Sequence, residues 1–342
     1  MTLDANSGQV IAALNPDEPI EPASLTKLMS AYVVFEALEN KRLSLNQTVN
    51  ISEAAWRTEG SRTFVKLNTQ VSIDDLLQGL IVQSGNDATV ALAEAVAGSE
   101  SAFATLMNQE AAKMGLKGTH YVNSTGLPDP AHLTTVRDLA VLAKNLVNRF
   151  PQYLHYYSEK EFTYNKIKQS NRNRLLWIDT TVDGLKTGHT KTAGYCLVST
   201  ALRGGRRVVS VVVGAPSNSA RTESSLKLLN WSFTNFDTIK LYDNTKPAVQ
   251  ARVWEGKVDQ VGLGGSQPTW VTVPRGKAGQ VKAVAQYTQP LIAPLKKGAK
   301  VGSVSLSLDG TMLRRDDLAV LDDVAEAGFF GRVYDKIRLM FH

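Results

Sequence analysis

Ser24-Leu-Thr-Lys27 places a hydroxyl and an amine three residues apart at the start of a predicted helix. Apolar residues recur at helical spacing between positions 28 and 38, which predicts a helix over residues 24–40. Side chains three residues apart share one helix face, so the Lys27 amine can reach the Ser24 oxygen. A serine hydroxyl is a weak nucleophile until a neighbouring base removes its proton. The stretch therefore predicts an activated serine, provided that burial and a second cation, Lys186, keep Lys27 largely uncharged.

A second motif, Ser84-Gly-Asn86, follows further along the chain. It separates a predicted helix over residues 73–82 from another that restarts at Asn86, so its side chains can point into a cleft. In such a position Ser84 can relay a proton to a leaving amine. Asn86 can hold Lys27 or a substrate amide.

A third motif, Lys186-Thr-Gly188, lies on a predicted strand. Lys186 offers a positive charge and Thr187 a hydroxyl to a substrate carboxylate, while Gly188 lets the substrate approach the backbone closely. The backbone N–H groups of Ser24 and His189 are the candidates for an oxyanion hole. The three motifs together predict a serine acyl-transfer site.

Order and context distinguish these motifs from copies that arise by chance. Ser224-Ser-Leu-Lys227 repeats the first spacing and Ser44-Leu-Asn46 repeats the second. Ser224 follows the third motif and lies in a half-buried helical pattern, so we expect it to be a surface residue. A Lys-Thr-Gly triplet occurs by chance in fewer than about one chain in ten. The histidines show no metal-ligand spacing, so we expect neither a metal nor another cofactor.

Changes in the spacing of apolar residues along the chain divide it into parts with different predicted secondary structure. Predicted helices dominate up to residue 147, and strands at 161–164, 192–202 and 207–213 precede a helix over 219–236. We therefore expect residues 1–237 to form an α/β (α+β) domain in which an antiparallel sheet packs with a helical cluster. Short strand-like runs with frequent glycine turns predict a small all-β domain over 238–325.

Residues 326–342 predict an amphipathic helix at the end of the chain. Phe330, Val333, Ile337 and Phe341 fall on one of its faces. This pattern is typical either of a helix docked on its own domain or of one lying in an anionic membrane surface.

Composition excludes several classes of protein. The chain has 342 residues, 43% of them hydrophobic, and a net charge of +6 without a block of consecutive basic residues, so we expect no nucleic-acid partner. Its one cysteine, Cys196, cannot form an internal disulfide and is expected to be a small buried residue. No apolar run reaches transmembrane length and no signal peptide is evident, which suggests a trimmed mature form.

Three segments carry a resemblance to a known family. They are Pro22-Ala-Ser-Leu-Thr-Lys-Leu-Met29, Gln83-Ser-Gly-Asn-Asp-Ala88 and Val182-Asp-Gly-Leu-Lys-Thr-Gly-His-Thr190. The chain resembles, over essentially its whole length, the low-molecular-mass penicillin-binding proteins that are serine-type D-alanyl-D-alanine carboxypeptidases of the penicillin-binding protein 5/6 type. The resemblance implies a penicillin-recognising transpeptidase-like domain, a β-rich stalk, and a terminal helix that tethers the enzyme to the periplasmic face of the inner membrane.

The same resemblance implies roles for individual residues. Ser24 is then the acylated nucleophile and Lys27 its base, with Ser84, Asn86 and Lys186 supplying the second and third elements. Arg221 is similar to a family arginine that helps to bind the terminal carboxylate, and Arg172 to a family cleft residue. The implied partners are a peptidoglycan pentapeptide stem, β-lactam antibiotics and the anionic membrane surface.

Other functions stay open at this point. A class A β-lactamase needs a glutamate that activates water. Glu161 and Asn165 have a suggestive spacing, but Phe162 and Tyr164 alternate as in a strand. A DD-endopeptidase and a non-catalytic cell-wall scaffold are the further alternatives. The terminal helix also ends at His342, earlier than the longer aromatic end that the family predicts.

Overall fold

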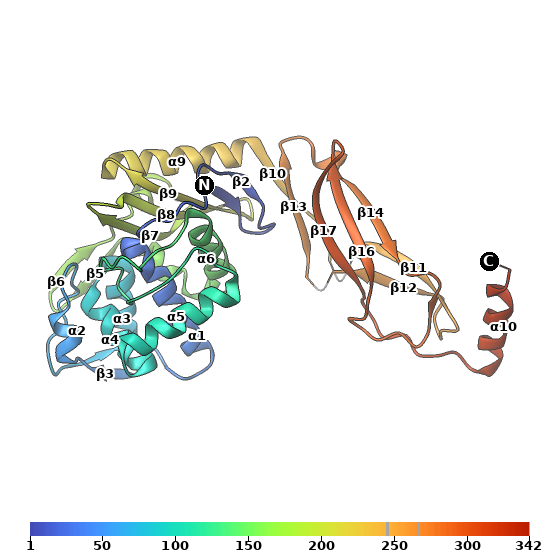
Figure 1. The fold of residues 1–342 in the computed structure, drawn as a ribbon, viewed down its shortest axis with the longest axis horizontal. Helices are drawn as coiled ribbons and strands as arrows, with labels where there is room; N and C mark the ends of the chain where they lie inside the picture. The colour runs from blue at the N-terminus through green and yellow to red at the C-terminus, as the bar shows by residue number, and fades with distance from the viewer. Residues whose placement is uncertain (244–245, 266, 342) are drawn as a thin grey trace. The chain divides into compact units, whose positions relative to one another are not determined.

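The computed structural model describes residues 1–243, 246–265 and 267–341, and they divide into two compact units (Figure 1). The first unit is Met1–Thr234, and the second begins at Asn235. His342, the last residue of the predicted terminal helix, lies outside the described residues.

A five-stranded antiparallel sheet with the order β2-β1-β9-β8-β7 forms the centre of the first unit. Its strands are β1 (Thr2–Asp4), β2 (Val10–Ala12), β7 (Val182–Thr190), β8 (Gly194–Arg203) and β9 (Arg206–Ala215). Strands β1 and β2 pair as a hairpin, and Gly8 in the turn between them adopts a φ of +73°. Strand β7, which carries the third motif, lies at one edge of the sheet.

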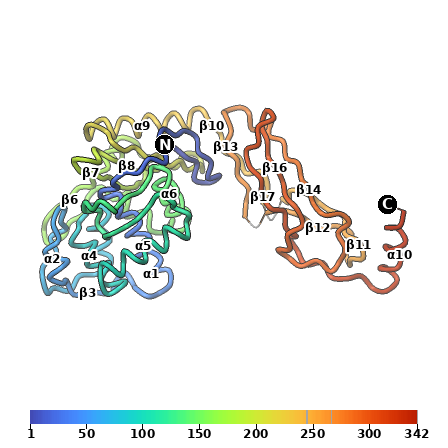
Figure 2. The backbone as a smooth tube through the Cα atoms, in the orientation of Figure 1, coloured from blue at the N-terminus to red at the C-terminus, as the bar shows by residue number. Residues whose placement is uncertain are grey.

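The helices surround this sheet on both faces. They are α1 (Lys27–Glu39), α2 (Glu53–Arg57), α3 (Ile73–Gln78), α4 (Asn86–Ala97), α5 (Glu100–Met114), α6 (Val136–Arg149), α7 (His155–Ser158), α8 (Leu175–Ile178) and α9 (Asn218–Asn235). Short turns of other helical types are η1 (Ala23–Thr26), η2 (Gly79–Gln83) and η3 (Pro151–Tyr153). Figure 2 traces α9 along one face of the sheet, while α1, α4, α5 and α6 lie on the other side.

Side chains along β8 alternate between the two faces of the sheet, and helices cover both faces because both carry apolar residues. Cys196 and Val198 point into the main core with the helical cluster, whereas Leu197 and Ala201 pack in a smaller core with Leu229 of α9. A strand with two buried faces reads as a nearly continuous apolar run, as this one does. The expected burial of Cys196 is confirmed.

Some local expectations differ from the structure. The predicted helix over 24–40 begins with the tight turn η1, and the one over 73–82 continues from α3 into the π-helical turn η2. The sheet-like pairs β3 (Thr48–Asn50) with β4 (Gln70–Ser72), and β5 (Glu161–Tyr164) with β6 (Ile167–Ser170), complete the first unit. Of these four strands only β5 was predicted, because three or four residues hold too little alternation to show a period.

The second unit has its own aliphatic core between β-sheets. Its strands are β10 (Phe236–Tyr242), β11 (Val249–Trp254), β12 (Gln260–Gly264), β13 (Thr269–Pro274), β14 (Lys282–Tyr287), β15 (Leu291–Ile292), β16 (Lys300–Leu308) and β17 (Thr311–Val320), with a short turn η4 (Ala278–Gln280). One sheet has the order β14-β16-β17-β12-β11-β15, and β10 pairs with β13. The predicted all-β architecture is confirmed.

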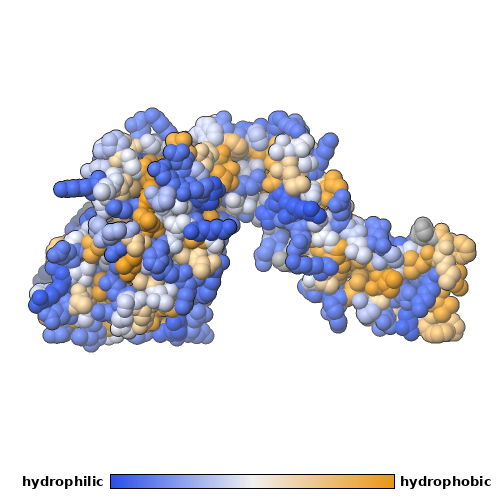
Figure 3. Space-filling view, viewed as in Figure 1, coloured by the Kyte–Doolittle hydropathy of each residue, from blue (hydrophilic) through white to orange (hydrophobic). Residues whose placement is uncertain are grey.

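Helix α10 (Phe329–Leu339) is the last helix among the described residues. Its apolar side chains are exposed, and the space-filling view shows them gathered over this helix (Figure 3). Among the described residues no single helix has both the length and the apolar composition of a membrane span, although the bent pair α4 and α5 meets these two criteria together.

Candidate active site

A cleft of about 970 Å³ in the first unit brings the three sequence motifs together. It is lined by Ser24, Gly60, Ser61, Arg62, Phe64, Gln83, Ser84, Ser170, Asn171, Arg172, Arg174, Thr187, Gly188, His189, Tyr195, Asn218 and Arg221. These described lining residues include four arginines and no acidic side chain. The cleft therefore favours an anionic ligand.

Lys27 lies fully buried at the first position of α1, directly after the turn that carries Ser24. Its Nζ is 3.2 Å from Ser24 Oγ, 2.6 Å from Asn86 Oδ1 and 2.7 Å from the Thr125 carbonyl oxygen. A neutral amine has two N–H groups and one lone pair. The two carbonyl oxygens accept those N–H groups, so the lone pair is left for the Ser24 hydroxyl proton.

Burial is the main reason that the pKa of Lys27 falls, to about 7, and the positive charge of Arg172 lowers it further. Asp87 and Glu100 act in the opposite direction. Lys186, the second cation expected from the sequence, also lies close enough to Lys27 for the two charges to interact. A substantial neutral fraction of Lys27 is therefore present near neutral pH.

The second and third motifs meet through one hydrogen bond. Lys186 Nζ donates to Ser84 Oγ at 2.9 Å and to the Thr187 carbonyl oxygen at 3.1 Å. Ser84 follows the π-helical turn η2 and has a φ of +66°, which turns its side chain into the cleft. Burial lowers the pKa of Lys186 well below its usual range, and the charges of Lys27, Arg172 and Arg221 add to this.

Gly188 allows β7 to approach the turn that carries Ser24. A Cβ atom at this position would lie 3.1 Å from Leu25 Cγ and 3.2 Å from the Pro22 carbonyl oxygen. The absence of a side chain therefore holds the third motif against the first.

Arg221 lies beneath the third motif. It extends from α9, is buried, and donates from Nη1 to the carbonyl oxygens of Gly188 at 3.3 Å and Cys196 at 3.2 Å. The His189 ring packs against Tyr195, with ring centroids 4.1 Å apart. Arg172, by contrast, is an exposed residue on the cleft wall, yet its guanidinium group is desolvated enough to lower its pKa.

One polar contact near Ser24, between Thr26 and His132, was not predicted from the sequence. Thr26 Oγ1 lies 2.8 Å from His132 Nε2 and donates to the Ala23 carbonyl oxygen at 2.8 Å. His132 Nδ1 accepts a hydrogen bond from the Val122 N–H, so its proton lies on Nε2. Burial lowers the pKa of His132 to about 4, which keeps the ring neutral. Because the two residues are far apart in sequence, only the fold reveals this pairing.

Comparison with known families agrees with this geometry. A family model described as D-alanyl-D-alanine carboxypeptidase matches residues 1–217. A second, described as the penicillin-binding protein 5 C-terminal domain, matches residues 236–326. The curated D-alanyl-D-alanine carboxypeptidase DacC of Escherichia coli is 44% identical over 99% of this chain and 87% of its own length.

Solved structures give the same result. Penicillin-binding protein 5 from Haemophilus influenzae matches with a TM-score of 0.89 and 44% identity, covering 95% of this chain and 96% of that one. Penicillin-binding protein D2 from Listeria monocytogenes in its cefotaxime-bound form matches with a TM-score of 0.62 and 31% identity, covering 68% and 95% respectively. The predicted family and fold class are thereby confirmed. The chain belongs to the D-alanyl-D-alanine carboxypeptidases, serine-type hydrolases of the penicillin-binding protein 5 kind.

Proposed function

We propose that Ser24 is the nucleophile through which this carboxypeptidase removes the terminal D-alanine of a peptidoglycan pentapeptide stem. The observation that carries the proposal is the position of Lys27 Nζ, 3.2 Å from Ser24 Oγ with two carbonyl oxygens on its other sides. Neutral Lys27 takes the hydroxyl proton while Ser24 Oγ attacks the carbonyl carbon of the D-Ala-D-Ala amide bond. The backbone N–H groups of Ser24 and His189 stabilise the oxyanion.

The second and third motifs complete the reaction. The proton passes from Lys27 to the leaving D-alanine nitrogen through Ser84, which Lys186 Nζ contacts at 2.9 Å. The C–N bond breaks, and an ester joins the shortened peptide to Ser24. Water then hydrolyses this ester and restores the free hydroxyl.

Recognition of the terminal carboxylate is proposed for the cationic part of the cleft. Thr187, Arg221 and Arg172 all line it, and buried Lys186 adds a charge close by. A bound carboxylate would raise the pKa of Lys186 and so keep it protonated. Gly188 leaves room for the substrate backbone along the edge strand β7.

The alternatives have less support. Glu161, considered above as a water-activating group, lies exposed on β5 and pairs with Lys168 at 2.7 Å. Glu161 is not among the described residues that line the cleft, which weakens the hypothesis that the protein is a class A β-lactamase. A scaffold would have no need of a buried amine beside a serine.

The second unit and its helix are proposed to hold the enzyme at the membrane. Asp335 Oδ2 accepts the Glu255 N–H at 2.7 Å, so a polar side chain of α10 contacts the residue that follows β11. The apolar side chains of α10 stay exposed. The helix also carries three basic side chains and one acidic one. This combination suits an anionic membrane surface, and with the family it supports a periplasmic location on the inner membrane.

Mass spectrometry of the intact protein after treatment with benzylpenicillin tests the catalytic proposal. We expect one covalent adduct that peptide mapping places on Ser24 and that persists long enough to be isolated. A Ser24→Ala variant should form none. An adduct on another residue, or none on the unaltered protein, would contradict the assignment.

A further inference from the structure

The cleft has a wall that none of the three motifs explains. Residues 59–65, called here the wall segment, follow α2 in an irregular path, and four of them line the cleft: Gly60, Ser61, Arg62 and Phe64. Phe64 has a φ of +67° and is 46% exposed, a strained conformation for a bulky residue. Such a backbone needs fixed partners outside the segment.

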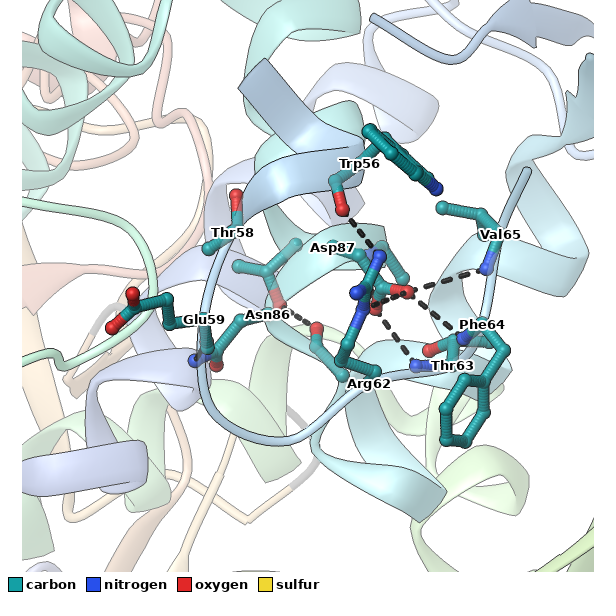
Figure 4. Close-up of polar contacts among 12 residues, drawn as sticks. Trp56, Thr58, Glu59, Arg62, Thr63, Phe64, Val65, Asn86 and Asp87 are labelled. Atoms are coloured by element: carbon teal, nitrogen blue, oxygen red, sulfur yellow. Dashed lines mark hydrogen bonds and ion pairs between the residues drawn. The ribbon is translucent and has the colours of Figure 1, made fainter. Parts of the chain in front are cut away.

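Asp87 supplies these partners. Its carboxylate is fully buried in the first turn of α4, and both oxygens point toward the wall segment (Figure 4). Oδ1 accepts the Thr63 N–H at 2.8 Å, and Oδ2 accepts the N–H groups of Phe64 at 2.9 Å and Val65 at 3.2 Å. Hydrogen bonds to a buried carboxylate are among the strongest that a loop can make.

The neighbouring Asn86 joins the same segment to the catalytic base. Its N–H donates to the Ser61 carbonyl oxygen at 2.7 Å, and its Nδ2 donates to the Glu59 carbonyl oxygen at 2.6 Å. Its Oδ1 accepts Lys27 Nζ at 2.6 Å. The wall segment and Lys27 are therefore held by two consecutive residues of one helix.

Little space is left between the wall segment and the start of α4. A Cβ atom on Gly85 would lie 2.0 Å from Thr63 Oγ1 and 2.9 Å from Asp87 Oδ1. One on Gly60 would lie 2.7 Å from Asn86 Nδ2. The segment thus has little freedom to move without moving Asn86.

We propose that Asp87 is a positioning residue of the carboxypeptidase: its carboxylate fixes the wall segment, and through Asn86 it fixes the place of Lys27 beside Ser24. This inference rests on the proposed role of Lys27. It assigns to Asp87 no contact with the substrate.

Asp87 also contributes charge. Arg62 Nε lies 3.9 Å from Asp87 Oδ2, and the guanidinium group donates to the Trp56 carbonyl oxygen. The charged groups that act on Lys27 are Arg172, which lowers its pKa, Asp87 and Glu100, which raise it, and Lys186, whose charge interacts with that of Lys27. Removal of the Asp87 charge should therefore shift the acid limb of the pH profile to lower pH.

Asp87→Asn tests the proposal, because the amide keeps the shape but turns an N–H donor toward backbone N–H groups. We expect kcat/KM for D-alanine release and the rate of benzylpenicillin acylation to fall about 10- to 100-fold. The acid limb should move downward in pH. Peptide mapping should still place the adduct on Ser24, which keeps a failure here distinct from a failure of the proposed function.

Asp138→Asn is the matched control. Asp138 is also a buried carboxylate in the first turn of a helix, where it accepts the Gly118 N–H at 2.8 Å and the Thr119 hydroxyl at 2.7 Å. The Asp138→Asn variant should lose about as much thermal stability as Asp87→Asn does. Its kcat/KM should stay within about twofold of the parent enzyme. Equal loss of activity in both variants, or an unmoved acid limb in Asp87→Asn, would overturn the proposal.

A second pair of variants serves if Asp87→Asn does not fold. Gly60→Ala presses a methyl group toward Asn86 Nδ2, whereas Gly98→Ala has a similar φ of +79° with nothing within 4 Å. Gly60→Ala should lower the acylation rate about tenfold more than Gly98→Ala. Equal acylation rates in these two variants would also overturn the proposal.

Discussion

The cleft of the first unit and the core of the second unit differ in what they bury. In and around the cleft, Lys27, Asp87, Lys186 and Arg221 are all buried. Among the described residues of the second unit, the buried polar side chains are Thr269 and Thr272. Aliphatic residues fill the rest of that core.

This difference in buried side chains indicates that the first unit carries the catalytic chemistry, whereas the core of the second unit serves stability. A buried charge costs free energy unless partners compensate it, so a protein rarely places several together for stability alone. In the first unit each such group has a partner on another segment, as Lys27 has on Asn86 and Thr125. The second unit uses the apolar packing that stabilises any small β domain.

A core substitution in the second unit should have the largest effect on stability and none on chemistry. Leu306→Ala removes a fully buried side chain of β16 and should lower the free energy of unfolding by about 2–5 kcal/mol. Calorimetry should show one transition move while kcat for D-alanine release stays constant. Leu142→Ala, a matched buried leucine in α6, should move the other transition. A fall in kcat for Leu306→Ala would break the comparison.

A cleft substitution should show the reverse. Lys186→Ala removes the group that holds Ser84, and we expect kcat/KM to fall about 100-fold with the fold retained. The exposed Lys191, just beyond the same strand, is the control: Lys191→Ala should stay within about twofold. Steady-state kinetics on a peptide ending in D-Ala-D-Ala measures both. Equal activities would remove the proposed role of Lys186.

The smallest effect is expected at the terminal helix. Phe330 is 87% exposed, and Phe330→Glu should weaken binding to vesicles of anionic phospholipid about tenfold without altering activity in solution. Met312→Glu, an exposed apolar residue on β17, should leave vesicle binding unchanged. Vesicle sedimentation compares them. Similar binding by all three proteins would refute the proposed membrane contact.

The sequence predicted the features that depend on neighbouring residues. The spacing of Ser24 and Lys27 follows from helix geometry, and the alternation in β8 from strand geometry. It also placed Ser84 at a break between helices, although the π-helical turn that makes the break is not visible in the pattern.

Contacts between distant segments could not be predicted in the same way. From the sequence alone, Asp87 is interpreted as a helix-capping residue, since it lies at the start of a predicted helix. Nothing near it in the sequence indicates that its partners are the N–H groups of residues 63–65. The pairing of His132 with Thr26 and the action of Arg172 on Lys27 are likewise products of tertiary structure. Side-chain burial decides these interactions, and burial is a property of the whole fold.

The most direct test of the central claim is a titration of Lys27 itself. Nuclear magnetic resonance of the isotope-labelled lysine side chains, with Lys27→Arg to assign the signal, should give a pKa of about 7 for Lys27. Acylation by benzylpenicillin should rise through the same pH range, since only the neutral amine can accept the Ser24 proton. A Lys27 that stays protonated across the pH range in which the enzyme is active would contradict the mechanism.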